Sequence, residues 1–175
     1  MENIKYPIGK FSIFREPNHD ERIALISSLH LLPDQLRETV RDLSEEQLET
    51  PYREGGWTIR QVAHHIADSH LNGYIRFKWA LTEEQPLIKV YHQDAWAQTS
   101  EAKSAPVLLS VTLLKALHNK WIVLLKKMSD EDYARKFEHP ETGPSTLGIA
   151  LALFEWHGRH HVAQIQSLRQ RLSWE

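Results

Sequence analysis

The last long segment of the chain, LGIALALFEWHGRHHVAQIQSLRQRL (residues 147–172), repeats apolar side chains at the spacing of an α-helix. One stripe of this helix carries Ala150, Phe154, Ile165 and Leu168. The same stripe carries His157 and His161, which are four residues apart. Because the apolar stripe of a long helix is buried against other helices, the segment indicates a helical bundle with both histidines facing its interior.

Three earlier segments show similar helical periodicity, at residues 20–43, 59–84 and 104–127. Pro33 lies inside the first of them and predicts a kink or a break, because proline lacks the helical N–H and its ring crowds the preceding turn. No strand-like alternation of useful length appears. Four long helices with mixed connections predict an all-α four-helix bundle that forms a single domain over residues 1–175.

Capping signals and breaks separate these helices. Capping boxes are formed by Ser44 with Gln47, Thr58 with Gln61 and Ser129 with Asp132. Ser104 is expected to cap the third long helix. Residues 1–18 are expected to form an extended arm, and residues 139–146 a turn-rich break. The long crossover connection at residues 85–104 is expected to hold one short turn, and either to be solvated or to cover a functional site.

The composition favours a soluble globular protein and excludes several other classes. The chain has 41% apolar residues, 25% charged residues, a net charge of −2 with histidine neutral, and no cysteine. Disulfides and thiolate metal sites are therefore excluded. The sequence shows no basic patch for nucleic acid, no signal peptide and no apolar run near the ~20 residues of a membrane span. A cytoplasmic protein that binds neither nucleic acid nor membrane is expected.

Six of the eleven histidines lie in two short windows, VAHHIADSH (residues 62–70) and WHGRHH (residues 156–161). His157 and His161 are one helical turn apart on one face, so their imidazoles can converge on a single ion. Two interior imidazoles otherwise each need a hydrogen-bond partner. A hydrogen-bonded histidine network and a chance clustering at exposed helix ends are the rival interpretations.

A third metal ligand must come from another helix, and the helix at residues 59–84 offers three candidates. His64 falls nearly opposite the apolar stripe of that helix, so its spacing excludes it. His65 and His70 both lie close to the stripe, and spacing does not choose between them. Three neutral imidazoles leave a coordination position open for water or substrate, as in catalytic zinc sites. Imidazole also suits nickel, copper and iron.

A resemblance to a known family rests on four segments: YPIG (6–9), TPYREGGWTIRQVAHHIADSH (50–70), NGYIRFKWALTEE (72–84) and WHGRHHVAQI (156–165). Together they resemble the YfiT-like group of proteins described as metal-dependent hydrolases, within the DinB-like superfamily of four-helix bundles. In that group three histidines bind one metal, and they correspond by motif to His65, His157 and His161. The resemblance therefore favours His65 over His70, and it implies one zinc or nickel ion per chain and a homodimer. Arg159 stands where the group has a histidine that is not a ligand.

An open metal site and this resemblance together predict metal-dependent hydrolysis of a small-molecule substrate. Asp68, three residues after His65, is the candidate catalytic residue, because it could orient an imidazole from behind; Glu155 is the alternative. Arg60 and Arg76 could meet an anionic substrate group or lie on a solvated helix face. Trp57 and Trp156 are expected to have packing roles.

Three further hypotheses stand beside hydrolysis. Members of the DinB-like superfamily are implicated in metal-assisted transfer of low-molecular-weight thiols such as bacillithiol, because a metal can hold a thiol as its reactive thiolate. Another hypothesis is a non-catalytic module that binds metal or responds to pH, since histidine changes its charge near pH 6. An interaction bundle with incidental histidines would show no stoichiometric metal.

Overall fold

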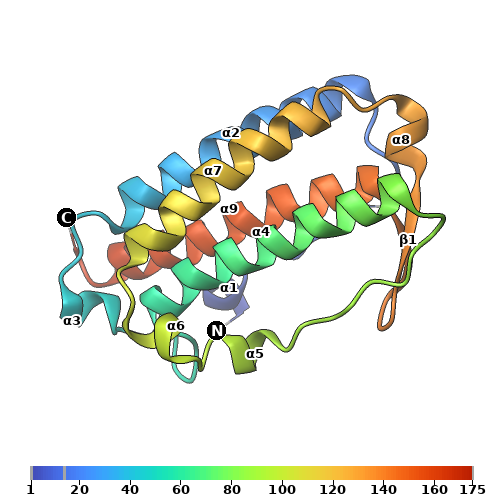
Figure 1. The fold of residues 1–175 in the computed structure, drawn as a ribbon. Helices are drawn as coiled ribbons and strands as arrows, with labels where there is room; N and C mark the ends of the chain where they lie inside the picture. The colour runs from blue at the N-terminus through green and yellow to red at the C-terminus, as the bar shows by residue number, and fades with distance from the viewer. Residues whose placement is uncertain (1, 14, 175) are drawn as a thin grey trace.

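The computed structural model describes residues 2–13 and 15–174, and its centre is a bundle of long helices (Figure 1). These helices are α2 (His19–Val40), α4 (Ile59–Thr82), α7 (Val107–Leu125) and α9 (Leu147–Arg171). Helices α2 and α4 each pack against both α7 and α9. Helices α2 and α9 run in one direction and α4 and α7 in the other, so the chain crosses the length of the bundle between α4 and α7 (Figure 1). The predicted all-α four-helix bundle with a long crossover is confirmed.

Shorter elements lie at the ends of the bundle and along the crossover. They are α1 (Glu2–Lys5), α3 (Glu45–Leu48), α5 (Gln93–Trp96), α6 (Ser100–Ser104), α8 (Asp130–Ala134), β1 (Lys136–His139) and β2 (Gly143–Thr146). All three predicted capping boxes are confirmed, at the starts of α3, α4 and α8. The side chain and the backbone of each N-cap residue exchange hydrogen bonds with the third helical residue, which satisfies N–H groups left free at a helix start.

Several local predictions differ from the structure. The arm at residues 1–18 begins with the short helix α1, and Ser104 ends α6 while Pro106 takes the N-cap of α7. The expected turn-rich break is a hairpin, in which β1 and β2 pair antiparallel. The left-handed φ of +78° at Gly143 suits the tight turn between them. Four-residue strands carry too little alternation to stand out in a sequence.

Helix α2 continues through Pro33, where a kink or a break was predicted. The missing N–H of Pro33 would have donated to the carbonyl of Leu29, four residues earlier. That carbonyl instead accepts a hydrogen bond of 2.7 Å from Nδ1 of His118, a fully buried residue of α7. A side chain from a neighbouring helix thus satisfies the carbonyl that proline leaves free, and the helix is not interrupted.

Two apolar clusters fill the bundle, and a layer of histidines lies between them. One cluster includes Leu36, Ile59 and Ile165, toward the end that carries α3. The other includes Phe77 and Leu147, toward the end that carries the hairpin. The histidines of this layer are His65, His70, His118, His157 and His161. Apolar packing on both sides holds these polar rings at one level along the helices.

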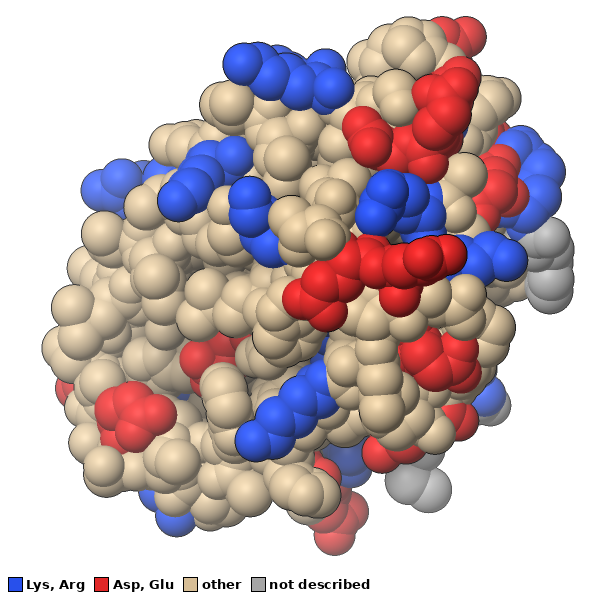
Figure 2. All heavy atoms as spheres, turned by 45° about the vertical axis from the view of Figure 1, so that its right-hand side comes forward, with Lys and Arg blue, Asp and Glu red and all other residues tan. Residues whose placement is uncertain are grey.

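The surface carries both signs of charge. On the face that Figure 2 shows, Lys and Arg side chains are interspersed with Asp and Glu side chains, and a broad area without charge lies beside them. Among the described helices, α7 is long and apolar enough to cross a membrane by length and composition, with a hydropathy of 1.4 over a window that is 39% buried. Because α7 packs against α2 and α4, this apolar composition is also that of a core helix of a bundle.

Candidate metal centre

Helices α4 and α9 bring three histidine rings together in the middle of the bundle. His65 comes from α4, and His157 and His161 come from adjacent turns of α9. One ring nitrogen from each lies within 4.8 Å of the other two. Nε2 of His65 is 3.2 Å from Nε2 of His157, close to the ~3.3 Å between ligands of a tetrahedral zinc with Zn–N bonds of about 2.0–2.1 Å. The structure thus brings together the three histidines that the family resemblance indicates.

Burial keeps these rings neutral, which is the form that binds a metal. Burial lowers the pKa of His65 to about 4. The pKa values of His157 and His161 lie well below the ordinary value because of burial first and neighbouring imidazoles second. Each neutral ring keeps one lone pair, and lone pairs that face one another across about 3 Å need a proton or a cation between them. The chemistry of the three donors therefore fits a divalent metal.

Gln164 determines which nitrogen of His161 is free. Nε2 of Gln164 donates to the carbonyl of Lys5 at 2.9 Å, and because a carbonyl can only accept, the amide orientation is defined. The amide oxygen then faces Nδ1 of His161 at 2.8 Å and accepts its proton. The remaining nitrogen, Nε2, keeps its lone pair for a metal. Gln164 was not predicted from the sequence, although residues three apart on a helix are neighbours, so its spacing from His161 indicates that the two side chains can contact each other.

Aromatic side chains enclose the centre. The Trp57 ring lies 4.6 Å from the His65 ring and 6.5 Å from the His161 ring, between centroids. Trp156 stacks on His160 at 4.7 Å, and His160 in turn accepts a hydrogen bond from the Gln164 amide at 3.0 Å. These tryptophans have the packing roles predicted for them, and the residues that they pack against belong to the candidate centre.

A cavity of about 440 Å³, here called the ligand cavity, adjoins the three imidazoles. Its walls include Tyr6, Trp57, Asp94, Trp156, His160 and Gln164. A second cavity of about 410 Å³, the arginine cavity, is lined by Ser69, Arg76, Tyr91, His139 and Glu141 among others. His157, Gln93 and Asp94 line both. The crossover at residues 85–104 therefore contributes to the walls of both cavities, which favours the second of its two predicted roles, covering a site, over a solvated connection.

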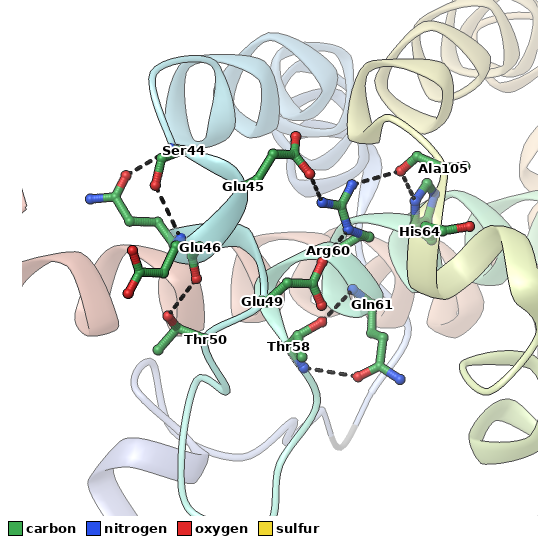
Figure 3. Close-up of polar contacts among 12 residues, drawn as sticks. Ser44, Glu45, Glu46, Glu49, Thr50, Thr58, Arg60, Gln61, His64 and Ala105 are labelled. Atoms are coloured by element: carbon green, nitrogen blue, oxygen red, sulfur yellow. Dashed lines mark hydrogen bonds and ion pairs between the residues drawn. The ribbon is translucent and has the colours of Figure 1, made fainter.

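Arg60 and Arg76, paired in the sequence analysis, have different surroundings. Arg60 has 3% of its side chain exposed and forms ion pairs with Glu45 and Glu49. It also donates to the carbonyl of Ala105 (Figure 3), so its role is to join α3, α4 and the loop before α7. Arg76 lines the arginine cavity, and its buried Nε has no hydrogen-bond partner among the described residues.

His64, the neighbour of His65, faces away from the centre. Its Nδ1 is 2.7 Å from Oγ of Ser110. Its Nε2 is 3.1 Å from the carbonyl of Ala105 (Figure 3). Its exclusion as a ligand by helical spacing agrees with this geometry.

The predicted orienting residues lie elsewhere. Burial, and next the charge of Glu101, raises the pKa of Asp68 to about 6. Within the described ranges no hydrogen bond joins its carboxylate to the three imidazoles, and Gln164 has the orienting position instead. Glu155 accepts from Ser28 of α2 at 2.6 Å and pairs with Arg159. Asp68 as a catalytic residue stays a prediction.

The fold and the converging imidazoles define a class: an all-α bundle with a candidate centre for one divalent metal. The family model of the DinB superfamily matches residues 28–165, and the chain belongs to this superfamily. A Bacillus cereus protein (strain ATCC 10987 / NRS 248) is 48% identical over 175 residues, which cover 99% of this chain and all of the relative. A Bacillus anthracis protein (strain CDC 684 / NRRL 3495) is 47% identical with the same coverage. The names of both assign metal-dependent hydrolase activity as a hypothesis.

Solved structures agree with this assignment. YfiT from Bacillus subtilis is 42% identical and superposes with a TM-score of 0.97 over 99% of each chain; it is described as an inferred metal-dependent hydrolase with an unusual four-helix bundle topology. The four-helix bundle protein TT2238 has a TM-score of 0.57 at 21% identity and covers 83% of this chain and 98% of its own, so it shares the fold. The resemblance read from the sequence is confirmed.

Proposed function

We propose that the protein is a metal-dependent hydrolase of a small molecule, with one divalent cation on His65, His157 and His161. The observation that carries the proposal is the convergence of three neutral imidazoles beside a cavity. Three protein ligands leave a position open, whereas a structural site closes it with a fourth. The names of the relatives support the same activity. Zinc and nickel are the proposed metals because imidazole suits both and the family resemblance implies one of them.

The side chains around the centre have distinct tasks in this proposal. A divalent cation supplies a Lewis acid and lowers the pKa of a coordinated water to about 7. Gln164 holds the His161 ring in its ligating tautomer, and Trp57 shields His65 from solvent on one side. Asp94 provides a carboxylate in the wall of the ligand cavity, where it can accept a proton from water.

The arginine cavity favours a substrate with an anionic group. Arg76 presents a buried Nε with no partner among the described residues, and burial lowers its pKa. A carboxylate or phosphate on Arg76 would offset this cost of desolvation. Because His157 lines both cavities, one extended molecule can contact Arg76 and the metal centre.

Elemental analysis of protein purified without a histidine tag tests the metal site. We expect about one zinc or nickel per chain, with stoichiometric metal lost in His157→Ala and His161→Ala. His64→Ala is the matched control and keeps its metal, because His64 faces Ser110. Equal metal content in all three variants would refute the ligand assignment.

Activity assays on the metal-loaded protein then test the reaction. Hydrolysis of generic esters and amides, lost together with the metal in His157→Ala, supports a hydrolase. If the protein conjugates thiols to electrophiles and hydrolyses none of the test substrates, thiol transfer replaces hydrolysis as the proposed reaction. If it binds metal and catalyses neither reaction, it is a metal-binding module.

A further inference from the structure

A second pair of histidines lies behind the candidate metal centre, and the proposed function does not use it. His70 of α4 and His118 of α7 are both fully buried. Nδ1 of His70 is 2.9 Å from Nε2 of His118, and their rings stack with centroids 5.0 Å apart. Burying two histidines this deeply between apolar clusters costs desolvation free energy, so each ring nitrogen needs a hydrogen-bond partner to offset it.

The carbonyl that Pro33 leaves free defines the proton positions of this pair. Because the Leu29 carbonyl can only accept, Nδ1 of His118 carries the proton that it donates at 2.7 Å. Neutral His118 then has a lone pair at Nε2, which accepts from Nδ1 of His70. Neutral His70 in turn has its lone pair at Nε2. The tautomer of His118 thus follows from the Leu29 carbonyl, which can only accept, and the tautomer of His70 follows from that of His118.

The two ends that remain are complementary. Nε2 of His70 is buried without a hydrogen-bond partner among the described residues, and so is Nδ1 of His157. The first is an acceptor; the second carries the proton when Nε2 of His157 faces the metal. The two ring centroids are 5.7 Å apart. In the relay proposed below, one bridging water or a small rotation of one ring joins these two nitrogens.

We propose that His70 and His118 are positioning residues that hold the metal ligand His157 through its Nδ1–H. The relay runs from the Leu29 carbonyl through His118 and His70 to His157, directly or across one water at the last step. The relay orients the His157 ring and makes its Nε2 a stronger electron-pair donor to the metal, as hydrogen-bonded partners of ligating histidines do. Because the relay ends on a carbonyl, which cannot take up a proton, it positions the ring and does not export protons. The inference rests on the proposed metal site.

Nitrogen NMR of histidine-labelled protein tests the tautomers directly, with and without zinc. Two-bond and three-bond couplings between ring carbon-bound protons and nitrogens show which nitrogen carries the proton. We expect His118 and His70 to be protonated at Nδ1 and not at Nε2. A proton on Nε2 of His70 would overturn the relay whether or not the protein binds metal. This measurement therefore separates its failure from a failure of the proposed function.

Metal affinity of matched variants provides the second test, by competition with a chelator. His118→Phe removes both hydrogen bonds that His118 forms, to the Leu29 carbonyl and to His70, and we expect zinc affinity to fall about 10- to 100-fold. His118→Gln can donate to Leu29 and accept from His70, so it should stay within about threefold of the wild type. His64→Gln is the control, because His64 is a buried histidine of α4 outside the relay. This variant should bind zinc with the affinity of the wild type.

The outcomes of the affinity test are distinct. Equal loss in His118→Phe and His118→Gln would mean that packing, and not the relay, matters. Unchanged affinity in both would also reject it. If His118→Phe does not fold, the tautomers of the wild-type protein decide alone. Absence of zinc binding by the wild type would refute the metal centre, while the tautomer result still stands for the His118–His70 pair.

Discussion

Single hydrogen bonds decide how the candidate ligands are presented. Gln164 joins the Lys5 carbonyl to His161, so the first residues of the chain stabilise one ring of the centre. His160 contacts the same amide and packs against Trp156 and Tyr6. Asp68 was predicted for the orienting role because it lies three residues after His65, but an amide anchored on a backbone carbonyl defines a tautomer equally well.

Replacing Gln164 by leucine should weaken metal binding without removing a ligand. Without the amide, Nδ1 of His161 has no defined acceptor and the ring can rotate or change its tautomer. We expect zinc affinity to fall about 10- to 100-fold, measured by chelator competition. Gln166→Leu, on the same helix but facing Thr39 of α2, is the matched control and should bind zinc normally. Wild-type affinity in Gln164→Leu would show that Gln164 does not orient His161.

Close contacts between helices set the level at which α4 and α9 meet. A Cβ at Gly73 of α4 would lie 2.6–2.8 Å from three ring atoms of Phe154 of α9. A Cβ at Gly158 of α9 would lie 2.1 Å from a methyl of Leu32 in α2. The absence of a side chain at Gly73 therefore lets α4 and α9 pack closely. The Phe154 ring also packs edge-on against His70 at 5.6 Å, so this contact adjoins the relay.

Gly73→Ala should destabilise the protein although alanine favours helices. The overpacking cost of about 1–3 kcal/mol exceeds the ~1 kcal/mol gained in helix propensity. Urea unfolding of the metal-free protein measures the change. In a double-mutant cycle, Phe154→Leu should relieve part of the loss, because the two side chains then no longer overlap. A variant at least as stable as the wild type would contradict the close contact.

The histidine layer makes the whole bundle sensitive to acid. Burial lowers the pKa of His65, His118 and His160 to about 4, and those of His70, His157 and His161 also fall. The unfolded chain takes up these protons near pH 6.5, while the folded chain resists them. Stability is therefore complete above pH 6.5 and is lost as the pH falls toward 4. Asp68 has the opposite effect: its pKa is raised to about 6, so the folded chain takes up this one proton more readily than the unfolded chain as the pH falls.

Urea unfolding of the metal-free protein between pH 7.5 and 4.5 measures this effect. We expect the free energy of unfolding to fall below pH 6.5, by up to about 1.4 kcal/mol per pH unit for each histidine that stays neutral in the folded state. The slope of the unfolding free energy against urea concentration should stay constant if unfolding exposes the same surface at each pH. A stability that does not change from pH 7 to pH 5 would contradict neutral burial of the layer.

Several properties at the scale of the molecule stay predictions. They are the single domain over residues 1–175, the homodimer, the cytoplasmic location and the absence of nucleic acid and membrane partners. Exposed Leu109, Leu113 and Val123 on α7 leave apolar surface available on one helix of the bundle.

The sequence by itself determined the four long helices, the capping boxes at the starts of α3, α4 and α8, and the HxxxH pair. All of these depend on contacts within about four residues, whose geometry is the same in every α-helix. By spacing alone, His65 and His70 were equivalent candidates for the third ligand, and a family resemblance was needed to separate them.

Only the tertiary structure decided what depends on how neighbouring helices are rotated and aligned along their axes. It directed His65 toward α9 and His70 toward His118. It also supplied the His118 donor that lets α2 continue through Pro33. Such contacts join residues 48 to 92 positions apart in the chain, and no local spacing encodes them, because packing of the whole core sets the relative position of two helices.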